Sequence, residues 1–563
     1  MRNLLYILLL VLSVVILFCQ VFLIDMGFNT FNDEAYFLMK LGEAYNGIID
    51  GASQWNQIAI KFFPYLNLTD KLQAYSASFL LSIIDCMLII GATVILSPSR
   101  SKLWLLIIVV TLVLYGGVGD LTYVNFMVLF LICSLTLFLF MLKAKHQGPR
   151  LLLGVGTGVC SVLAILSILP GGILVLAAYA LMLLVFYWKE WENLTIAYIG
   201  GVLGIVLGVL LVNFFVTDVS SIYEAMKVTA ATITKNGRGY DPYTFLLHLY
   251  IVLRDWGLTI IIIGSLYVLS VKIQNKYKQL TLPIVILWLG VLLTYGYFWR
   301  KLHSTPALIC SIAILVPWCV QLTDNLQPMK INWKQQILYV FLLLFPLIAS
   351  FGTNLPLGLR MGAFVFAWIY LYFIYLQPKL QTNQLYNEFG KVLLLLSLFA
   401  WLIPSIGLVN PVIKKIKGEY AYFEPNYNSP IADVKLTRQQ VEYFHRVDSI
   451  LEALHFQKEK STILAFDEDR ATCYALCCQC AILPYEPGDL ISNPAYQMQP
   501  DFLLMADWEK DYCIKPYSDI LSIWKLEEIY DTINVGSPQC EPGMDWPRKL
   551  YFKRTQKKNY ETP

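Results

Sequence analysis

Two adjacent carboxylates, Asp33 and Glu34, lie a few residues beyond an apolar run from Leu4 to Ile24. Ionisable groups at a membrane boundary are costly to keep partly desolvated, so they point to a function there. One carboxylate can accept a proton from a hydroxyl group while the other orients a ligand or a divalent cation. Asn32 followed by two acids is also a good helix start, so N-terminal capping is an equal alternative, and the two roles are compatible.

The chain that must position these groups is strongly apolar. Hydrophobic residues make up 57% of its 563 residues and charged residues only 14%, with a mean hydropathy of +0.58. A soluble domain would carry about 25% charged residues. We therefore expect an α-helical multi-pass integral membrane protein with about thirteen spans of about 20 residues each. The net charge of +3 gives no indication of a nucleic-acid partner.

The distribution of basic residues predicts the orientation of the spans. If Arg2 stays in the cytoplasm, alternate connections should be basic. The connections predicted inside carry Arg100, Lys102, Lys143, Lys145, Arg150, Lys272, Lys276, Lys278, Lys330, Lys334, Lys379 and Lys391. The connection at 189–192 is neutral to acidic and fits least well. With this count, everything after Asn410 lies outside.

The first connection predicted outside, residues 25–73, is long and amphipathic. Asp33 to Tyr45 and Gln54 to Phe63 alternate apolar and polar residues at helical spacing. This pattern predicts two short helices lying in the membrane interface. A later outside connection, Pro170-Gly171-Gly172, is expected to be a hinge between two spans.

The composition changes after Asn410, where charges become frequent and no spanning run follows. The pattern predicts an amphipathic helix, a strand, a helix and a second strand, at 437–457, 461–467, 470–480 and 501–506. A strand, helix, strand order indicates a small α/β domain with a parallel pair of strands.

The cysteines of this C-terminal domain lie outside the membrane, where disulfides persist. The disulfide candidates are Cys473, Cys477, Cys478, Cys480, Cys513 and Cys540. Sequence alone does not select their pairing. Free thiols and a metal site are alternatives, but the spacing of the first four does not match the paired Cys-x-x-Cys units of common zinc sites.

A first span followed by an outside loop opening with Asp33-Glu34-Ala35-Tyr36 resembles the GT-C superfamily of polyprenyl-phosphate-sugar-dependent integral membrane glycosyltransferases. Its members include protein O-mannosyltransferases, lipid A aminoarabinose transferase and oligosaccharyltransferase catalytic subunits. The resemblance implies a transmembrane glycosyltransferase domain over 1–409 and an extracytoplasmic α/β domain over 410–563. It also implies a bacterial cytoplasmic (inner) membrane, with an endomembrane as the alternative, and a role in cell-envelope glycan biosynthesis.

The same resemblance implies roles for the acidic residues. Asp33 would be the base that activates the acceptor, with Glu34 beside it. Asp120, in the next outside loop, would be the second acidic residue that commonly shares the site. Asp33 and Asp120 are then the candidate ligands of a divalent metal ion as cofactor. An equal alternative is that Asp120 caps the helix beginning at Leu121.

A sugar donor on a lipid phosphate also requires cations outside the membrane. The candidates in the outside connections are Lys61, Lys235, Arg238, Arg300, Lys301, His303 and Arg360. The segment His303-Ser304-Thr305-Pro306 partly matches the His-Tyr-x-x-Pro-like segment of bacterial members. Each cation alone could instead contact lipid headgroups.

The predicted function is inverting transfer of a sugar from a polyprenyl-phosphate donor to a hydroxyl of a glycan, lipid or protein acceptor at the outer face. One alternative is an O-antigen ligase or polymerase, which is usually built around a large central outside loop. Another is a lipid or polysaccharide flippase or transporter, which tends to carry internal repeats and charges within its spans. Here the spans are nearly free of charge except for Asp85 and Arg254-Asp255. Membrane lipids are further expected partners.

Overall fold

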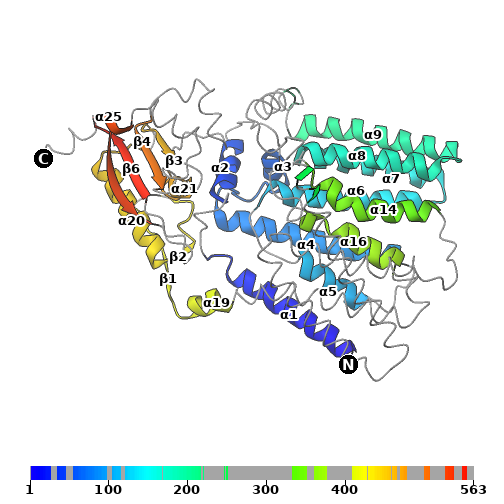
Figure 1. Cartoon of the computed structure of the whole chain (residues 1–563), viewed down its shortest axis with the longest axis horizontal. Helices are drawn as coiled ribbons and strands as arrows, with labels where there is room; N and C mark the ends of the chain where they lie inside the picture. The colour runs from blue at the N-terminus through cyan, green and yellow to red at the C-terminus, as the bar shows by residue number, and fades with distance from the viewer. Residues whose placement is uncertain are drawn as a thin grey trace.

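A bundle of apolar helices and a smaller unit of sheet and helices make up the part of the protein that the structure, a computed structural model, describes (Figure 1). The described residues are 2–26, 34–45, 55–97, 104–115, 121–167, 169–216, 218, 220, 223, 246–247, 249–250, 333–351, 361–376, 409–425, 427, 429–457, 460–465, 470–477, 500–506, 526–537 and 548–554. The predicted helical class is confirmed over these residues. The number of thirteen spans and the C-terminal α/β domain remain predictions.

The helices of the bundle follow the predicted spans. They are α1 (Arg2–Phe22), α4 (Lys71–Leu96), α5 (Trp104–Tyr115), α6 (Tyr123–Lys143), α7 (Gln147–Ser167), α8 (Leu169–Tyr187), α9 (Trp191–Phe215) and α14 (Trp333–Ala349). Among the described helices, α4, α6, α7 and α9 are long and apolar enough to cross a membrane. Such helices satisfy their own backbone hydrogen bonds in hydrocarbon. The chain is therefore an integral membrane protein.

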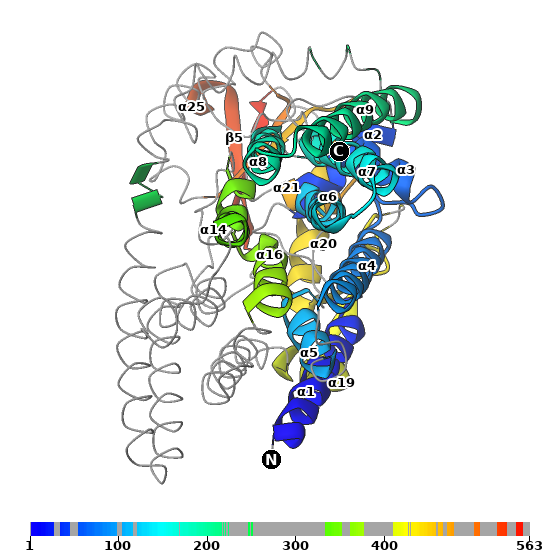
Figure 2. The same cartoon turned by 90° about the vertical axis from the view of Figure 1, so that its right-hand side faces the viewer.

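A further helical segment, η2 (Gly362–Phe364), α16 (Phe366–Tyr370) and η3 (Leu371–Leu376), lies beside α4 and α14. Figure 2, seen along the helices, shows α1 and α5 at one edge of the bundle and α9 at the other. The large aromatic side chains of the bundle, such as Phe138, Phe345 and Trp368, are fully buried. They form one continuous core with the apolar residues of the first loop.

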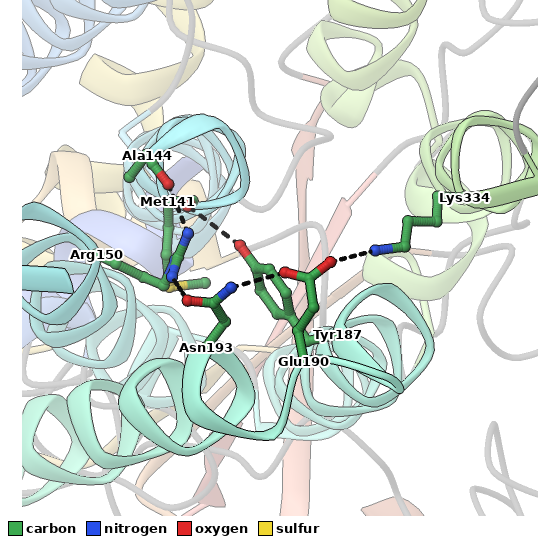
Figure 3. Close-up of polar contacts among 7 residues, drawn as sticks. All are labelled: Met141, Ala144, Arg150, Tyr187, Glu190, Asn193 and Lys334. Atoms are coloured by element: carbon green, nitrogen blue, oxygen red, sulfur yellow. Dashed lines mark hydrogen bonds and ion pairs between the residues drawn. The ribbon is translucent and has the colours of Figure 1, made fainter. Parts of the chain in front are cut away.

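One end of the bundle gathers three connections that the charge pattern predicts on the same side (Figure 3). Arg150 donates to the Ala144 carbonyl, 2.6 Å away, and to the Asn193 side chain. Glu190 accepts hydrogen bonds from Asn193, at 2.6 Å, and from the Lys334 Nζ, at 2.9 Å. The hydrogen bonds from these two residues hold the pKa of Glu190 below its usual value. The acidic connection that fits the charge rule least well is thus paired with a basic one.

The helices α7 and α9 approach so closely that only glycine fits between them. A Cβ on Gly204 would lie 2.1 Å from the Val155 carbonyl oxygen, and a Cβ on Gly158 would lie 2.5 Å from that of Gly201. Small residues at four-residue spacing allow such approach between helices in a membrane. Backbone packing, rather than large side chains, therefore joins this pair.

The hinge predicted at Pro170-Gly171-Gly172 is wrong, because these residues form the first turn of α8. Proline is tolerated there, since the N–H groups of a first turn need no helical partner. The glycines serve close packing. A Cβ on Gly171 would lie 2.5 Å from the Ala349 carbonyl oxygen, and one on Gly172 would lie 2.7 Å from the Ile165 Cα.

The chain after the bundle forms the sheet unit, which contains α19 (Val409–Ile416), β1 (Tyr420–Tyr422), β2 (Lys435–Thr437), α20 (Arg438–Ala453), β3 (Ile463–Ala465), α21 (Arg470–Ala475), β4 (Phe502–Ala506), α25 (Leu526–Ile529), β5 (Tyr530–Gly536) and β6 (Arg548–Lys553). Strands β1 and β2 pair antiparallel, and the main sheet has the order β3-β4-β6-β5. The predicted parallel pair is confirmed as β3 and β4. Strand β6 lies antiparallel between β4 and β5, and neither β5 nor β6 was predicted.

The two helices predicted in the first loop are confirmed as α2 (Glu34–Tyr45) and α3 (Trp55–Phe62). Figure 1 shows α2 between the sheet unit and the bundle. On the bundle side α2 packs against α3, which in turn contacts α6, and on the other side it packs against α21. Helix α2 is therefore enclosed between the two parts of the protein.

Candidate active site

Helix α2 begins at Glu34 and is fixed by an aromatic contact one turn later. The ring of Phe37 meets the rings of Trp55 and Tyr123 edge to face, with centroids 5.8 and 5.9 Å apart. The next turns of α2 are buried through Leu38 and Leu41. The apolar face of α2 thus fixes the helix against α3 and the start of α6.

Buried amides of α3 add polar contacts to this packing. The Asn56 side chain donates to the Lys40 carbonyl at 3.3 Å, and the Gln57 side chain donates to the Ala44 carbonyl at 3.4 Å. The Ala44 carbonyl lies in the last turn of α2, where carbonyls have no helical partner, so the Gln57 contact stabilises the end of this helix. The Tyr45 hydroxyl donates to the Leu66 carbonyl at 2.7 Å, which ties α2 to the chain beyond α3.

The start of α6 shows that one alternative for Asp120 is wrong. The N-cap of α6 is Thr122, whose Oγ1 accepts the Val124 N–H at 3.2 Å. The Asn125 side chain accepts the Thr122 N–H in return, at 2.8 Å, and completes a capping box. Asp120 is therefore not needed as the cap of this helix.

The Tyr115 hydroxyl links the end of α5 to the segment that follows Arg360. It donates to the Ala363 carbonyl at 3.0 Å and accepts the Phe366 N–H at 2.7 Å. The connection containing Asp120 begins immediately after Tyr115. Two connections with candidate residues therefore adjoin at this hydroxyl.

The structure describes few of the predicted site residues themselves. Glu34 is the first residue of α2, and Lys61 is exposed in the last turn of α3. The others lie outside the described residues: Asp33, Asp120, Lys235, Arg238, Arg300, Lys301, His303 and Arg360. Asp33 immediately precedes α2 in the sequence, and its capping role stays a prediction beside its catalytic one. The described residues hold no group of three or more His, Cys, Asp or Glu that could bind a metal ion.

The cysteine predictions are also open. Cys473 is buried in α21 and Cys477 is exposed just beyond it. Cys478, Cys480, Cys513 and Cys540 lie outside the described residues. Their disulfide pairing stays a prediction.

Two lysines at this end of the bundle escaped the sequence analysis. Lys40 of α2 and Lys71 at the start of α4 are both buried. The Lys71 Nζ lies 4.9 Å from the ring centroid of Tyr75, within cation–π range. Both lie in the first connection predicted outside, but nothing in the local sequence distinguishes them as candidate phosphate contacts. Their burial, rather than the sequence, identifies them.

The sheet unit is tied to the first loop at two places. The Tyr474 hydroxyl of α21 donates to the Thr69 carbonyl, next to Asp70, the N-cap of α4. Burial raises the pKa of the Asp70 carboxyl, and the nearby Asp433 adds to this effect. At the second place, the Lys435 N–H donates to the Asp25 carbonyl at 2.7 Å.

The Asp25 side chain completes this second tie. Its Oδ1 accepts a hydrogen bond from the Lys415 Nζ of α19, and its Oδ2 lies 3.6 Å from the Lys435 Nζ of β2. Met26 forms a parallel bridge with Lys435. The backbone that leads from α1 to Asp33 thus starts from a fixed point.

Comparison with known proteins gives similarity at the level of structure. No family model and no curated protein matches the chain. Among solved structures, the chain is similar to the oligosaccharyltransferase of Archaeoglobus fulgidus in complex with Zn and sulfate, with 11% identity, a TM-score of 0.48, and coverage of 94% of this chain and 71% of the other. The chain is also similar to the same enzyme tethered with an acceptor peptide containing the NVT sequon, with 12% identity, a TM-score of 0.47, and coverage of 93% of this chain and 72% of the other.

A third structure, the archaeal enzyme with an inhibitory peptide and a dolichol-phosphate, gives 13% identity, a TM-score of 0.45, and coverage of 93% and 72%. Oligosaccharyltransferases are among the members of the superfamily that the sequence resembles. Similarity of this degree assigns no activity, substrate or site residue to this chain.

Proposed function

We propose that the protein is an inverting glycosyltransferase of the GT-C class that uses a polyprenyl-phosphate-linked sugar. The observation that carries the proposal is the contact between Phe37 and Tyr123. Phe37 lies three residues after Glu34, and Tyr123 lies three residues after Asp120. Three residues of extended chain span at most about 11 Å. The two acidic segments therefore start from one packed anchor, as a shared site requires.

The contact at Tyr115 supports a cation near the same place. Ala363, which accepts its hydrogen bond, lies three residues after Arg360. Three residues of extended chain span at most about 11 Å, so the backbone of Arg360 lies within about that distance of Ala363. An arginine can bind a phosphate in a bidentate manner and offset the charge that develops on it. The remaining proposed phosphate contacts are Lys61, Lys235, Arg238, Arg300, Lys301 and His303.

In the proposed reaction, Asp33 takes the proton of the acceptor hydroxyl, and the hydroxyl oxygen attacks the anomeric carbon of the sugar. The bond between that carbon and the phosphate oxygen breaks, and its electron pair leaves with the lipid phosphate. Attack from the face opposite the leaving group inverts the anomeric centre. Glu34 would orient the acceptor. A divalent cation held by Asp33 and Asp120 would neutralise phosphate charge, but the scheme does not depend on it.

The proposal includes the membrane orientation and the two domains. Residues 1–409 would form the catalytic transmembrane domain and residues 410–563 an extracytoplasmic domain, in a bacterial inner membrane. The ties of Thr69 to Tyr474 and of Asp25 to Lys435 support this arrangement, since they require the first loop and the sheet unit to share one side.

A transfer assay with purified protein in nanodiscs tests the proposal, using a panel of polyprenyl-phosphate sugars and glycan, lipid and peptide acceptors. We expect Asp33→Asn to lower the transfer rate by about 100-fold or more, as for loss of a general base. The matched control is Asp218→Asn, an exposed acid of another connection predicted outside. Loss of transfer in Asp33→Asn with unchanged thermal unfolding supports the role of Asp33 as the base. Full activity of Asp33→Asn would contradict this role.

A further inference from the structure

Helix α19 has an apolar face that remains exposed. Ile413 is 44% exposed and Ile416 is 72% exposed. At about 100° per residue these two side chains lie on one side of the helix. Lys414 and Lys417 are exposed as well. Lys414 lies on the side away from Ile413 and Ile416, and Lys417 directly follows the last residue of α19. A helix with bulky apolar residues on one side and lysines beside that face suits a membrane surface.

The position of α19 agrees with this chemistry. Its Lys415 Nζ donates to the Phe22 carbonyl at the end of α1 and lies 4.3 Å from the centroid of the Phe22 ring. Both views show α19 beside this end of α1 (Figures 1 and 2). The last turns of α1 are themselves exposed and apolar, with Phe18 70% exposed. The isoleucines of α19 therefore extend an apolar surface that α1 presents at its end.

We propose that α19 is a lipid-binding helix, which inserts Ile413 and Ile416 among the acyl chains of the leaflet at this end of α1. Lys414 and Lys417 contact the phosphates of anionic phospholipids in the same leaflet. The occupant is lipid rather than a second protein, because α19 lies against the end of α1, where the apolar side chains of α1 are exposed as well. A lysine near an anionic membrane surface strengthens binding by about five-fold.

The contact at Asp25 gives this lipid binding a structural consequence. Lys415 of α19 and Lys435 of β2 share the Asp25 carboxylate. The depth at which α19 lies therefore sets the height of the sheet unit above the membrane and the position at which the first loop begins. This role is independent of the proposed transfer reaction.

Photo-crosslinking of the full-length protein tests the proposal. The variant Ile416→p-benzoylphenylalanine is placed in nanodiscs of phosphatidylcholine, with or without phosphatidylglycerol, and its adducts are identified by mass spectrometry. We expect lipid adducts in both bilayers, and phosphatidylglycerol adducts in excess of its share of the bilayer. The control Glu528→p-benzoylphenylalanine, on α25 at the far side of the sheet unit, should give no lipid adducts. Protein adducts alone, or none, at position 416 overturn the proposal.

The lysines are tested in the same crosslinking background. Lys414→Gln with Lys417→Gln should remove most of the phosphatidylglycerol excess while the acyl-chain adducts remain. The matched control is Lys460→Gln, an exposed lysine of the sheet unit distant in sequence from α19, which should leave the excess unchanged. An excess that survives the double substitution overturns the headgroup contact. Thermal unfolding of each variant verifies that the protein is folded.

Discussion

Phe37 of α2 contacts Tyr123 of α6 edge to face, with 5.9 Å between ring centroids and 68° between ring planes. The two residues belong to helices far apart in the sequence, and each lies three residues after a candidate acidic residue. Aromatic pairs of this geometry contribute about 0.5–1.5 kcal/mol beyond their area burial. The contact therefore stabilises the packing of α2 against the start of α6.

Replacement of Phe37 should show whether its ring contact affects the transfer rate separately from the thermal stability of the protein. We expect Phe37→Leu to lower the thermal stability modestly, by about 1–2 kcal/mol, and to lower the transfer rate more than that loss explains. The control is Phe186→Leu at the other end of the bundle, where the ring contacts Tyr187 with centroids 5.4 Å apart. Transfer rates and unfolding are measured for both. Equal loss of transfer in the two variants would show that the Phe37 contact has no special role.

The glycine contact between α7 and α9 predicts a sharp difference between neighbouring positions. Gly204→Ala places a Cβ 2.1 Å from the backbone oxygen of Val155, so the helices must separate. We expect a loss of about 1–3 kcal/mol, as for overpacking. Gly201→Ala meets nothing within 4 Å and should be neutral or stabilising by up to about 1 kcal/mol. Thermal unfolding in one detergent compares the two, and equal effects would contradict the packing described.

Arg150 should contribute more to stability than an exposed lysine of the same connection. Its buried guanidinium binds the Ala144 carbonyl and the Asn193 side chain and lies 5.1 Å from the ring centroid of Tyr187. Arg150→Met leaves these acceptors without their charged donor and should cost about 2 kcal/mol. Lys145→Met, at an exposed site, should change the unfolding free energy by less than about 0.5 kcal/mol. A neutral Arg150→Met would contradict this assignment.

The sheet unit should lose stability in acid through Asp501. Burial acts to raise the pKa of this carboxyl, but the Thr462 N–H and the Lys553 ammonium, 3.0 and 3.2 Å away, outweigh it and hold the pKa below the usual 3.8. A lowered pKa means that the ionised form stabilises the folded state. This stability is present above the unfolded pKa and is lost as the pH falls through the folded pKa.

Unfolding of the full chain, followed from neutral pH to about pH 3, measures this effect. Asp501→Asn should be less stable than the natural protein at neutral pH, and the difference should shrink in acid. The half-buried Asp531, which accepts a hydrogen bond from Arg554 at 3.2 Å, provides the control Asp531→Asn. A constant difference across the pH range would show that ionisation of Asp501 is not the cause.

Helices and strands could be predicted from the sequence where a single helical or strand spacing of apolar residues dominates. Helices α2 and α3 follow from helical spacing, and α20 begins at a capping box formed by Thr437 and Gln440. Strand β6 was missed because lysine and arginine flank its short apolar centre, and β5 because charged and polar residues alternate with its apolar ones. Proline and glycine at 170–172 suggested a hinge because their role in close packing depends on Ala349, which is far away in sequence.

The arrangement of the candidate site could be predicted only in part. The residue types and the loops that carry them follow from the sequence. The contact of Phe37 with Tyr123 joins residues 86 positions apart, since 123 minus 37 is 86, and no local pattern encodes it. The spacing of Gly200, Gly204 and Gly208 is visible in the sequence, but the helix that they face is not. Buried Lys40 and Lys71 likewise became visible only through packing.

Asp25 is a single carboxylate with two counterions that arrive from separate elements late in the chain, Lys415 from α19 and Lys435 from β2. A polypeptide emerging in order from its N-terminus must hold this acid at the membrane edge until more than half of the chain has followed. We expect the first loop to reach its final position only after both lysines have been synthesised. Folding of the sheet unit would then be a condition of maturation for the transmembrane part.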